Sequence, residues 1–226
     1  TLYSSILAGS NANEIVNTAE IALSGYEAPQ GVEYRFTGEI KQQSENQEFL
    51  SGALLTGIAL IILLLVFQFN SISKPFIVLA SIVLSFTGVF MGIIIFNLTF
   101  SILMTMLGII SLTGIIVNNA VVLIDYTQLL FDRKKIDLNM SKDEIVDKVT
   151  AMELVKTAGK ARLKPVLLTA ITTIFGLIPL AVGLNIDFFS LFANWDPNVY
   201  LGGDNVIFWG PLAWTVIFGI TFATFL

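Results

Sequence analysis

Five long stretches of this chain contain no Asp, Glu, Lys or Arg, and each has roughly the 20 residues that a helix needs to cross a bilayer. They are residues 49–69, 75–96, 101–124, 165–184 and 206–226. Lipid offers no partner for exposed backbone polar groups, so stretches that cross a membrane at this length must be helical. The sequence therefore predicts an α-helical polytopic membrane protein with five transmembrane helices.

The composition agrees with this class and excludes several kinds of site. Of the 226 residues, 55% are hydrophobic and 13% are charged, about half the charged fraction of a typical soluble domain. There is no cysteine and no histidine, which excludes disulfides, histidine acid–base catalysis and the usual zinc and haem ligands. We expect a membrane protein that is not an enzyme, with no cofactor, no metal site and no nucleic-acid partner.

The basic residues predict how the spans are oriented. Nine of the twelve Lys and Arg residues lie in the 125–164 loop, and a tenth, Lys74, lies in the short turn between the first two spans. The connection 185–205 has no basic residue and carries three aspartates. The positive-inside rule places the turn and the loop in the cytoplasm, and hence the amino-terminal segment outside.

The first 48 residues differ in character from the rest. Ala12–Leu23 has helical apolar spacing, the A-P-Q-G segment breaks it, and residues 32–38 alternate as a strand does. A segment of this length cannot bury a core by itself. We expect residues 1–48 to be the tail of a larger α+β domain and residues 49–226 to be the transmembrane domain. Because the last span stops inside an apolar run, we also expect a fragment or a truncated chain.

The cytoplasmic loop 125–164 is predicted to contain a helix of its own. Ser141 and Glu144 form a capping box, and an apolar stripe follows on one helix face. The stripe consists of Ile145, Val149, Met152 and Val155. Lysines occupy the other faces, so the helix is expected to lie along the inner membrane surface. The alternative is a solvated connector that packs on the helix ends.

Two adjacent asparagines lie in the third span. A side-chain amide in hydrocarbon costs several kcal/mol, roughly, unless it is hydrogen bonded, so Asn118 and Asn119 indicate an internal polar site. The alternative is that they only join neighbouring helices. Asp125 lies seven residues after Asn118 on the same helix face. It is a secondary candidate or, next to Tyr126, an ordinary interfacial anchor.

The fourth span adds a second group of polar residues. Arg162 and Lys164 precede Pro165, which is expected to start the helix. Thr169 lies on the same face as Arg162, about 10 Å deeper in the membrane. Arg162 and Thr169 either face the helix bundle, or the basic residues are membrane anchors and Thr169 bonds its own backbone.

Four segments of the sequence resemble those of one transporter family. They are Y-R-F-T-G-E before the first span, F-N-S-I-S-K-P after it, G-I-I-V-N-N-A-V-V-L-I-D-Y, and A-R-L-K-P-V-L-L-T-A-I-T-T-I-F-G-L-I-P-L-A-V-G. In this order they resemble the carboxyl-terminal half of a resistance–nodulation–division (RND) efflux permease of the hydrophobe/amphiphile, AcrB-like type. The resemblance implies that residues 1–48 end a periplasmic porter domain and that the five spans are helices eight to twelve of twelve.

The resemblance also implies a function and partners. Members of this family are homotrimers in the bacterial inner membrane that exchange protons for hydrophobic or amphiphilic compounds. They act with a periplasmic adaptor protein and an outer-membrane channel. This chain would then need the amino-terminal half of the same pump, would contact the lipid bilayer, and would use protons rather than a cofactor. Its amino-terminal segment would be periplasmic.

The candidate relay residues follow from the same resemblance. In the family, the tenth helix carries a Lys-Asn pair and the eleventh an Arg and a Thr, which face two aspartates on the fourth helix. By position, Asn119, Arg162 and Thr169 match the Asn, Arg and Thr, whereas Asn118 replaces the lysine. An asparagine supplies only dipoles, so the facing carboxylates should be easier to protonate unless another cation substitutes. Arg162 is the only nearby candidate in this half of the pump.

Two other functions stay open and one is disfavoured. A pump for heavy-metal cations would need carboxylates, Met or Cys along its path, but the spans hold no interior carboxylate, and Met91, Met104 and Met106 are expected to serve packing. A non-transporting remnant, in which the asparagines only fix packing, is the other alternative. An intramembrane enzyme is disfavoured because no Ser is paired with a base and Asp125 is peripheral.

Overall fold

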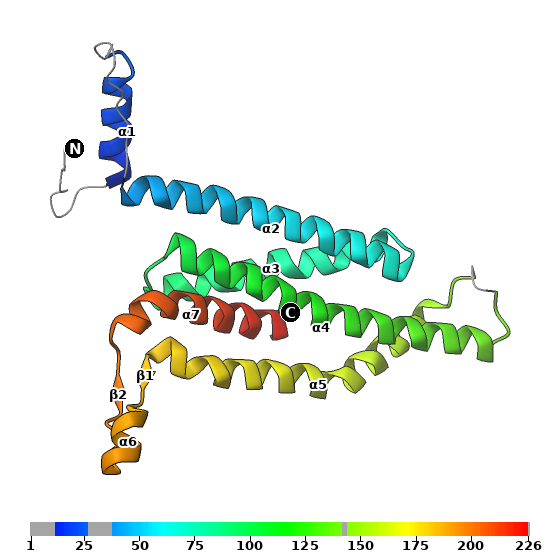
Figure 1. Cartoon of the computed structure of the whole chain (residues 1–226). Helices are drawn as coiled ribbons and strands as arrows, with labels where there is room; N and C mark the ends of the chain where they lie inside the picture. Colours follow the sequence, from blue (N-terminus) through cyan, green and yellow to red (C-terminus); the bar gives the residue numbers. More distant parts are fainter. Residues whose placement is uncertain (1–11, 27–37, 142–143, 226) are drawn as a thin grey trace. The chain divides into compact units, whose positions relative to one another are not determined.

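The computed structural model describes residues 12–26, 38–141 and 144–225 (Figure 1). The chain divides into two compact units, residues 1–52 and residues 53–226. Its elements, in chain order, are α1 Ala12–Leu23, α2 Glu39–Phe69, α3 Ser73–Ile95, α4 Ile102–Asp137, α5 Lys148–Val182, β1 Leu184–Asn185, α6 Phe188–Asn194, β2 Tyr200–Leu201 and α7 Asp204–Phe225.

The first unit contains α1 and the polar beginning of α2. The bounds of α1 are those that the apolar spacing predicts. Of the strand predicted at 32–38, all but Gly38 lies outside the described residues. α2 begins at Glu39, before the predicted span at 49, because its first turns consist of polar residues that favour helix. An ion pair between Lys41 and Glu45, 3.7 Å apart, supports these turns.

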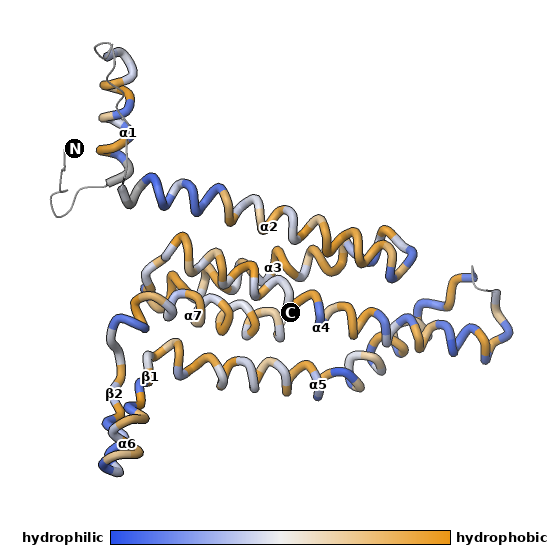
Figure 2. The backbone as a smooth tube through the Cα atoms, in the orientation of Figure 1, coloured by the Kyte–Doolittle hydropathy of each residue, from blue (hydrophilic) through white to orange (hydrophobic). Residues whose placement is uncertain are grey.

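Within the described residues, five helices are long and apolar enough to cross a membrane by length and composition. They are α2, α3, α4, α5 and α7, in the order that the uncharged stretches predict. Figure 2 shows hydrophobic residues along most of α3, α4, α5 and α7, and hydrophilic residues towards the end of α4. The prediction of a helical protein with five spans is confirmed in this sense. The porter domain and the total of twelve spans stay predictions.

α7 is the central helix of the second unit. It packs against α3, α4 and α5, which lie around it (Figure 1). The larger of two buried apolar clusters also includes Leu65 of α2, and its members are Leu65, Val78, Ile82, Val89, Leu112, Ile116, Ala170, Val216 and Ile220. The smaller cluster joins α5 to α7 and consists of Ala181, Ala213 and Ile217. The core members on α3 and α4 recur at helical spacing, so each of these helices buries one continuous face.

Glycines allow α7 to approach its neighbours closely. A Cβ on Gly92 of α3 would overlap the side chain of Phe218 on α7. On α7 itself, a Cβ on Gly219 would overlap the side chain of Leu112 from α4. Small residues at such crossings let the backbones come together, as is typical of packed membrane helices.

The start predicted for the loop helix is wrong. The capping box of Ser141 and Glu144 predicts a helix from Ser141 onward, but α5 begins at Lys148. The carboxylate of Asp147 caps α5 by accepting the Val149 N–H at 3.1 Å. Glu144 does accept the Ser141 N–H, at 3.0 Å, but neither residue is helical. Asp147, rather than the pair of Ser141 and Glu144, therefore caps the start of α5.

α5 is also one continuous helix, where a loop helix and a separate span were predicted. It runs from Lys148 to Val182 and holds Pro165 in its interior rather than at its start. Pro165 lacks an N–H, so the helix loses one backbone hydrogen bond there. The residues before it are rich in Ala, Leu, Met, Lys and Glu, which favour helix strongly enough to continue it. Val149 and Met152 of the apolar stripe are exposed, and their place on the membrane surface stays a prediction.

The connection between α5 and α7 carries a small structure that the sequence patterns did not predict. β1 and β2 pair antiparallel, with Asn185 opposite Tyr200. The Asn185 amide donates to the carbonyl oxygens of Gly183 at 2.9 Å and Gly202 at 2.7 Å, which closes the base of the hairpin. The short helix α6 lies between the strands in sequence, and Asp187 caps it with its carboxylate.

Candidate functional site

The candidate relay residues lie on two packed helices. α4 carries Asn118, Asn119 and Asp125, and α5 carries Arg162 and Thr169. The two helices run in opposite directions and are in contact (Figure 1). Side chains seven residues apart share a helix face. A shared face therefore joins Asn118 to Asp125 on α4 and Arg162 to Thr169 on α5, two turns apart in each case.

The clearest contact between the two helices joins Arg162 to Tyr126. The guanidinium carbon of Arg162 lies 4.5 Å from the centroid of the Tyr126 ring. A cation over an aromatic ring is stabilised by roughly 0.5–1 kcal/mol at exposed sites and by about 2 kcal/mol where water is excluded. Arg162 thus lies against α4. Sequence reasoning gave Tyr126 only an interfacial role, although its spacing of seven from Asn119 was available as a signal.

One edge of the Arg162 guanidinium is buried and another is accessible. Its Nε atom is buried and has no hydrogen-bond partner among the described residues. Nη1 and Nη2 make no hydrogen bond in that part of the chain either, but they are not buried. An unpaired buried N–H costs roughly 1–3 kcal/mol, which the ring contact and the helix packing must offset. The open Nη edge is available to bind a further group.

The two asparagines lie on different faces of α4. Asn119 is partly buried and shares a face with Tyr126. Asn118 is exposed and shares a face with Asp125, which is exposed as well. Neither amide is hydrogen bonded to another residue that the structure describes. Asparagines that only joined neighbouring helices would need such a bond. The described residues contain none for Asn118 or Asn119.

Thr169 makes its hydrogen bonds within α5. It is exposed, and its hydroxyl donates to the carbonyl oxygen of Val166 at 2.9 Å. Its carbonyl oxygen accepts from the hydroxyls of Thr172 at 3.1 Å and Thr173 at 2.8 Å, two residues that sequence reasoning did not single out. The backbone-bonded alternative is therefore the one present here. The hydroxyl oxygen can still accept from another group.

The contact between Arg162 and Tyr126 joins α4 to α5 at one level. Asn119 precedes Tyr126 by seven residues, and Thr169 follows Arg162 by seven residues. Because the helices are antiparallel, both spacings run in the same direction from the contact of Tyr126 and Arg162, but among the described residues no hydrogen bond joins Asn119 to Thr169. The structure thus brings Arg162 and Tyr126 together, whereas Thr169 is exposed and bonded to Val166. Asp125 is exposed on another face of α4 and takes no part in this contact.

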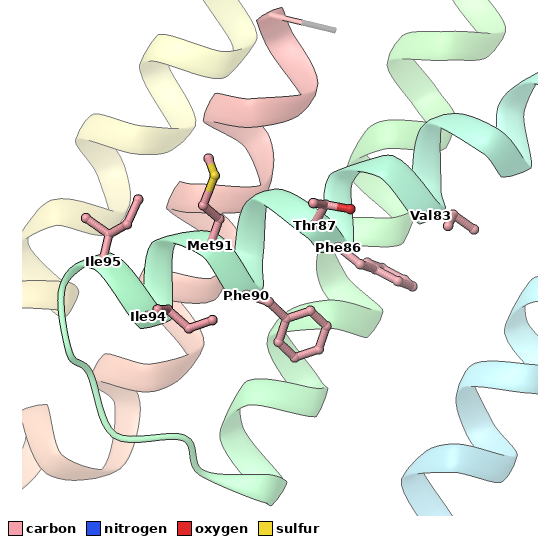
Figure 3. Close-up of a pocket in the computed structure, with 7 residues that line it drawn as sticks. All are labelled: Val83, Phe86, Thr87, Phe90, Met91, Ile94 and Ile95. Carbon is pink, nitrogen blue, oxygen red and sulfur yellow. The ribbon is translucent and has the colours of Figure 1, made fainter.

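A furrow on α3 is a second feature that sequence reasoning did not find. Its volume is about 540 Å³, and its lining comes from α3 alone: Val83, Phe86, Thr87, Phe90, Met91, Ile94 and Ile95 (Figure 3). Figure 3 shows a hydroxyl on Thr87 and a sulfur on Met91 among otherwise hydrocarbon side chains. Met91 is 45% exposed, which differs from its expected packing role, whereas Met104 is buried. Among the described residues, no group of three Asp or Glu side chains could hold a metal ion.

Comparisons with known proteins identify relatives of this chain. A family model described as the AcrB/AcrD/AcrF family matches residues 2–185. The swarming motility protein SwrC of Bacillus subtilis is 34% identical over 174 residues, which are 77% of this chain and 14% of that protein. The multidrug resistance protein MdtC of Erwinia tasmaniensis is 25% identical over 164 residues, which are 73% of this chain and 15% of that protein. The chain thus spans only about one seventh of these relatives.

A solved structure has a similar fold. The crystal structure of a heavy metal efflux pump matches with a TM-score of 0.64 and 22% identity, covering 96% of this chain and 18% of that chain. At this identity the likeness speaks for the fold alone. The family match, in contrast, covers the α4 and α5 segments that carry Asn119, Tyr126, Arg162 and Thr169. With most of its length matched, the chain belongs to the AcrB/AcrD/AcrF family of RND permeases.

Proposed function

We propose that this chain is part of a proton-driven RND permease that exports hydrophobic or amphiphilic compounds across the inner membrane and periplasm. The family supports the transporter class, and five helices of sufficient length support a multi-pass membrane location. The observation that carries the proposal is Arg162, a cation held against α4 with an accessible Nη edge. An ionisable side chain on a membrane helix that faces its neighbours is typical of ion or proton pathways.

In this proposal, Arg162 is the charge that responds to proton binding. Its Nη atoms pair with carboxylates supplied by another part of the permease, as long as those carboxylates are ionised. Two unit charges 4 Å apart attract by about 4 kcal/mol at an effective dielectric constant of about 20. Protonation removes this attraction, and the helices then settle into a second arrangement that is passed on to the porter domain.

Asn119 and Thr169 serve the protonated state. Both side chains hydrogen bond without charge, so they bind neutral carboxyl groups that no longer hold Arg162. Asn118 contributes only a dipole at the lysine position, which leaves Arg162 as the main positive charge of the relay. Asp125, on the exposed face of α4, is a secondary candidate near the cytoplasmic entrance for protons.

The proposal includes partners and a location. The chain acts as part of a homotrimer in the bacterial inner membrane, together with the amino-terminal half of the same permease. A periplasmic adaptor protein and an outer-membrane channel complete the export path. The segment before α2 is periplasmic, since the positive-inside rule places the basic α4–α5 connection in the cytoplasm.

A pump for heavy-metal cations is the second candidate. The observation that favours it is the exposed thioether of Met91, because soft metals such as Cu(I) bind thioethers. The apolar lining of the furrow around Met91 favours organic compounds instead. Substrate class is therefore the first thing to measure.

The test uses the complete permease that carries this segment, expressed in an efflux-deficient bacterium that is hypersensitive to drugs and metals. The minimal inhibitory concentrations of ethidium, novobiocin, copper, silver and zinc are measured for the wild type, Asn119→Ala, Arg162→Ala and Lys164→Ala. Lys164 is an exposed cation two residues from Arg162 and serves as the matched control. Membrane levels and trimer formation are followed for each variant.

We expect the wild type to raise resistance to the two organic compounds. Arg162→Ala and Asn119→Ala should abolish this gain at unchanged membrane level, and Lys164→Ala should retain it. Full resistance in both Arg162→Ala and Asn119→Ala would refute the relay. Resistance to metals alone would establish the second candidate, and no resistance to any compound from a folded trimer would identify a non-transporting remnant.

A further inference from the structure

Tyr126 has a place in the relay that follows from its contact with Arg162. This inference rests on the proposed proton relay and adds one residue to it. We propose that Tyr126 is a positioning residue: its ring holds the Arg162 guanidinium so that only the Nη edge faces the carboxylates that exchange protons. Tyr126 itself touches neither the proton nor the exported compound.

The first observation is the direction in which Arg162 points. A long basic side chain near a helix end can extend along the helix until its charge reaches water. Arg162 instead lies folded onto α4, with its guanidinium carbon 4.5 Å from the centroid of the Tyr126 ring. Lys164, two residues further along α5, is exposed. The Tyr126 ring thus holds Arg162 between the two helices, whereas the Lys164 side chain is exposed.

The second observation is the buried, unpaired Nε of Arg162. A flexible side chain that was free to rotate would turn this N–H towards water or towards an acceptor. It stays buried, so the ring and the surrounding helices fix the conformation of the guanidinium against that preference. The planar group has five N–H donors in a rigid fork. With the Nε side closed, the Nη side is the part left to bind a carboxylate.

The third observation is the row to which Tyr126 belongs. It lies two turns from Asn119 on the same, α5-facing side of α4, and Arg162 lies two turns from Thr169 on α5. Tyr126 therefore lies on the same face of α4 as the candidate relay residue Asn119. Since Asn118 supplies no charge at the lysine position, the direction of the single Arg162 charge matters more here than in a site with two cations.

The test measures coupling rather than growth. The complete permease is reconstituted in proteoliposomes containing a pH-sensitive dye, and ethidium-dependent proton flux is recorded under an imposed pH gradient. The variants are Tyr126→Phe, which keeps the ring, and Tyr126→Leu, which keeps apolar bulk without a ring face. Phe131→Leu is the matched control, because Phe131 is a partly buried aromatic residue on α4 that carries no cation among the described residues. Arg162→Ala is included as the reference for a lost relay.

We expect Tyr126→Phe and Phe131→Leu to retain at least half of the wild-type flux, and Tyr126→Leu to lose at least tenfold. A series of fluorinated rings separates a positioning role from a merely structural one, because packing depends on the volume of the ring and cation binding on the charge of its face. Wild-type flux in Tyr126→Leu, together with lost flux in Arg162→Ala, would overturn the positioning role and leave the relay intact. Wild-type flux in Arg162→Ala would overturn the relay itself.

A second series keeps the test decisive if Tyr126→Leu does not fold. Phenylalanine, 4-fluorophenylalanine and 3,4,5-trifluorophenylalanine are incorporated at position 126. Fluorine withdraws the negative charge of the ring face and changes its shape little, so it weakens the attraction for a cation stepwise. Proton flux should fall with each step. Equal flux across the three rings would overturn the proposal.

Discussion

Phe218 of α7 lies against Gly92 of α3, at a place where a Cβ on residue 92 would overlap its ring. The same ring stacks on Phe96 with the centroids 5.2 Å apart, and on Trp214 with the centroids 5.3 Å apart. One contact therefore combines a close backbone crossing with a group of three aromatic rings. The position of α7 against α3 depends on the absence of a side chain at residue 92.

Gly92→Ala should destabilise the permease by about 1–3 kcal/mol, because the added methyl group forces α7 away from α3. Thermal unfolding of the purified permease in detergent measures the change. Gly114→Ala is the control, since a Cβ there meets no atom within 4 Å. That variant should be neutral or gain roughly 0.5–1 kcal/mol from helix propensity. Equal losses in both variants would contradict the crossing.

Asn118→Lys should move the pH dependence of transport. A lysine adds a positive charge that favours the ionised form of the facing carboxylates, so protons bind them only at lower pH. The half-maximal pH of ethidium-dependent proton flux should fall by about one unit. Asn118 is exposed in the described chain, so the longer side chain has room. Asn118→Gln keeps a neutral amide and should leave the profile in place; a rise in the half-maximal pH with Asn118→Lys would contradict the assignment.

Asp147→Ala should loosen the first turn of α5. The Asp147 carboxylate accepts the Val149 N–H at 3.1 Å, and loss of such a cap costs about 1 kcal/mol. Hydrogen–deuterium exchange should become faster at residues 148–151 and stay unchanged around Pro165. Glu153→Ala removes an exposed carboxylate from the helix interior and should not affect the same amides.

Asn185→Asp should open the β1–β2 hairpin. The Asn185 amide donates to two carbonyl oxygens, those of Gly183 and Gly202, and a carboxylate in its place cannot donate to either. The variant should lose roughly 1–3 kcal/mol locally, seen as faster amide exchange in residues 183–203. Asn194→Asp makes the same chemical change on α6 and should leave β1 and β2 protected.

The membrane helices were predictable because each contains an uncharged apolar stretch, and charge is what hydrocarbon excludes most strongly. Their ends were not predictable from the same signal. α2 begins in polar residues at Glu39, α4 continues past Asp125 to Asp137, and α5 runs through Pro165. The hydrophobic stretch marks where lipid would surround a helix, whereas local propensity and caps decide where the helix stops.

The candidate residues come from the sequence alone, whereas the contact between Arg162 and Tyr126 comes from the structure. Arg162 and Asn119 follow from matching motifs along one helix at a time. The stack of Arg162 on Tyr126 depends on the register between α4 and α5 across their loop, and no spacing within either helix determines it. Asn118 and Asn119 are adjacent in sequence, yet α4 turns them to different faces. Thr169 bonds its own backbone, as one of its two interpretations allowed.

The central place of α7 has a consequence for biosynthesis. A ribosome delivers α3, α4 and α5 to the membrane before α7, which supplies the buried partner for all three. Until then Gly92 of α3 and Leu112 of α4 lack the residues of α7 that they contact in the folded unit. The contacts of α4 with α3 and α5 can form earlier, but the buried faces that α7 covers are completed only when α7 has been inserted.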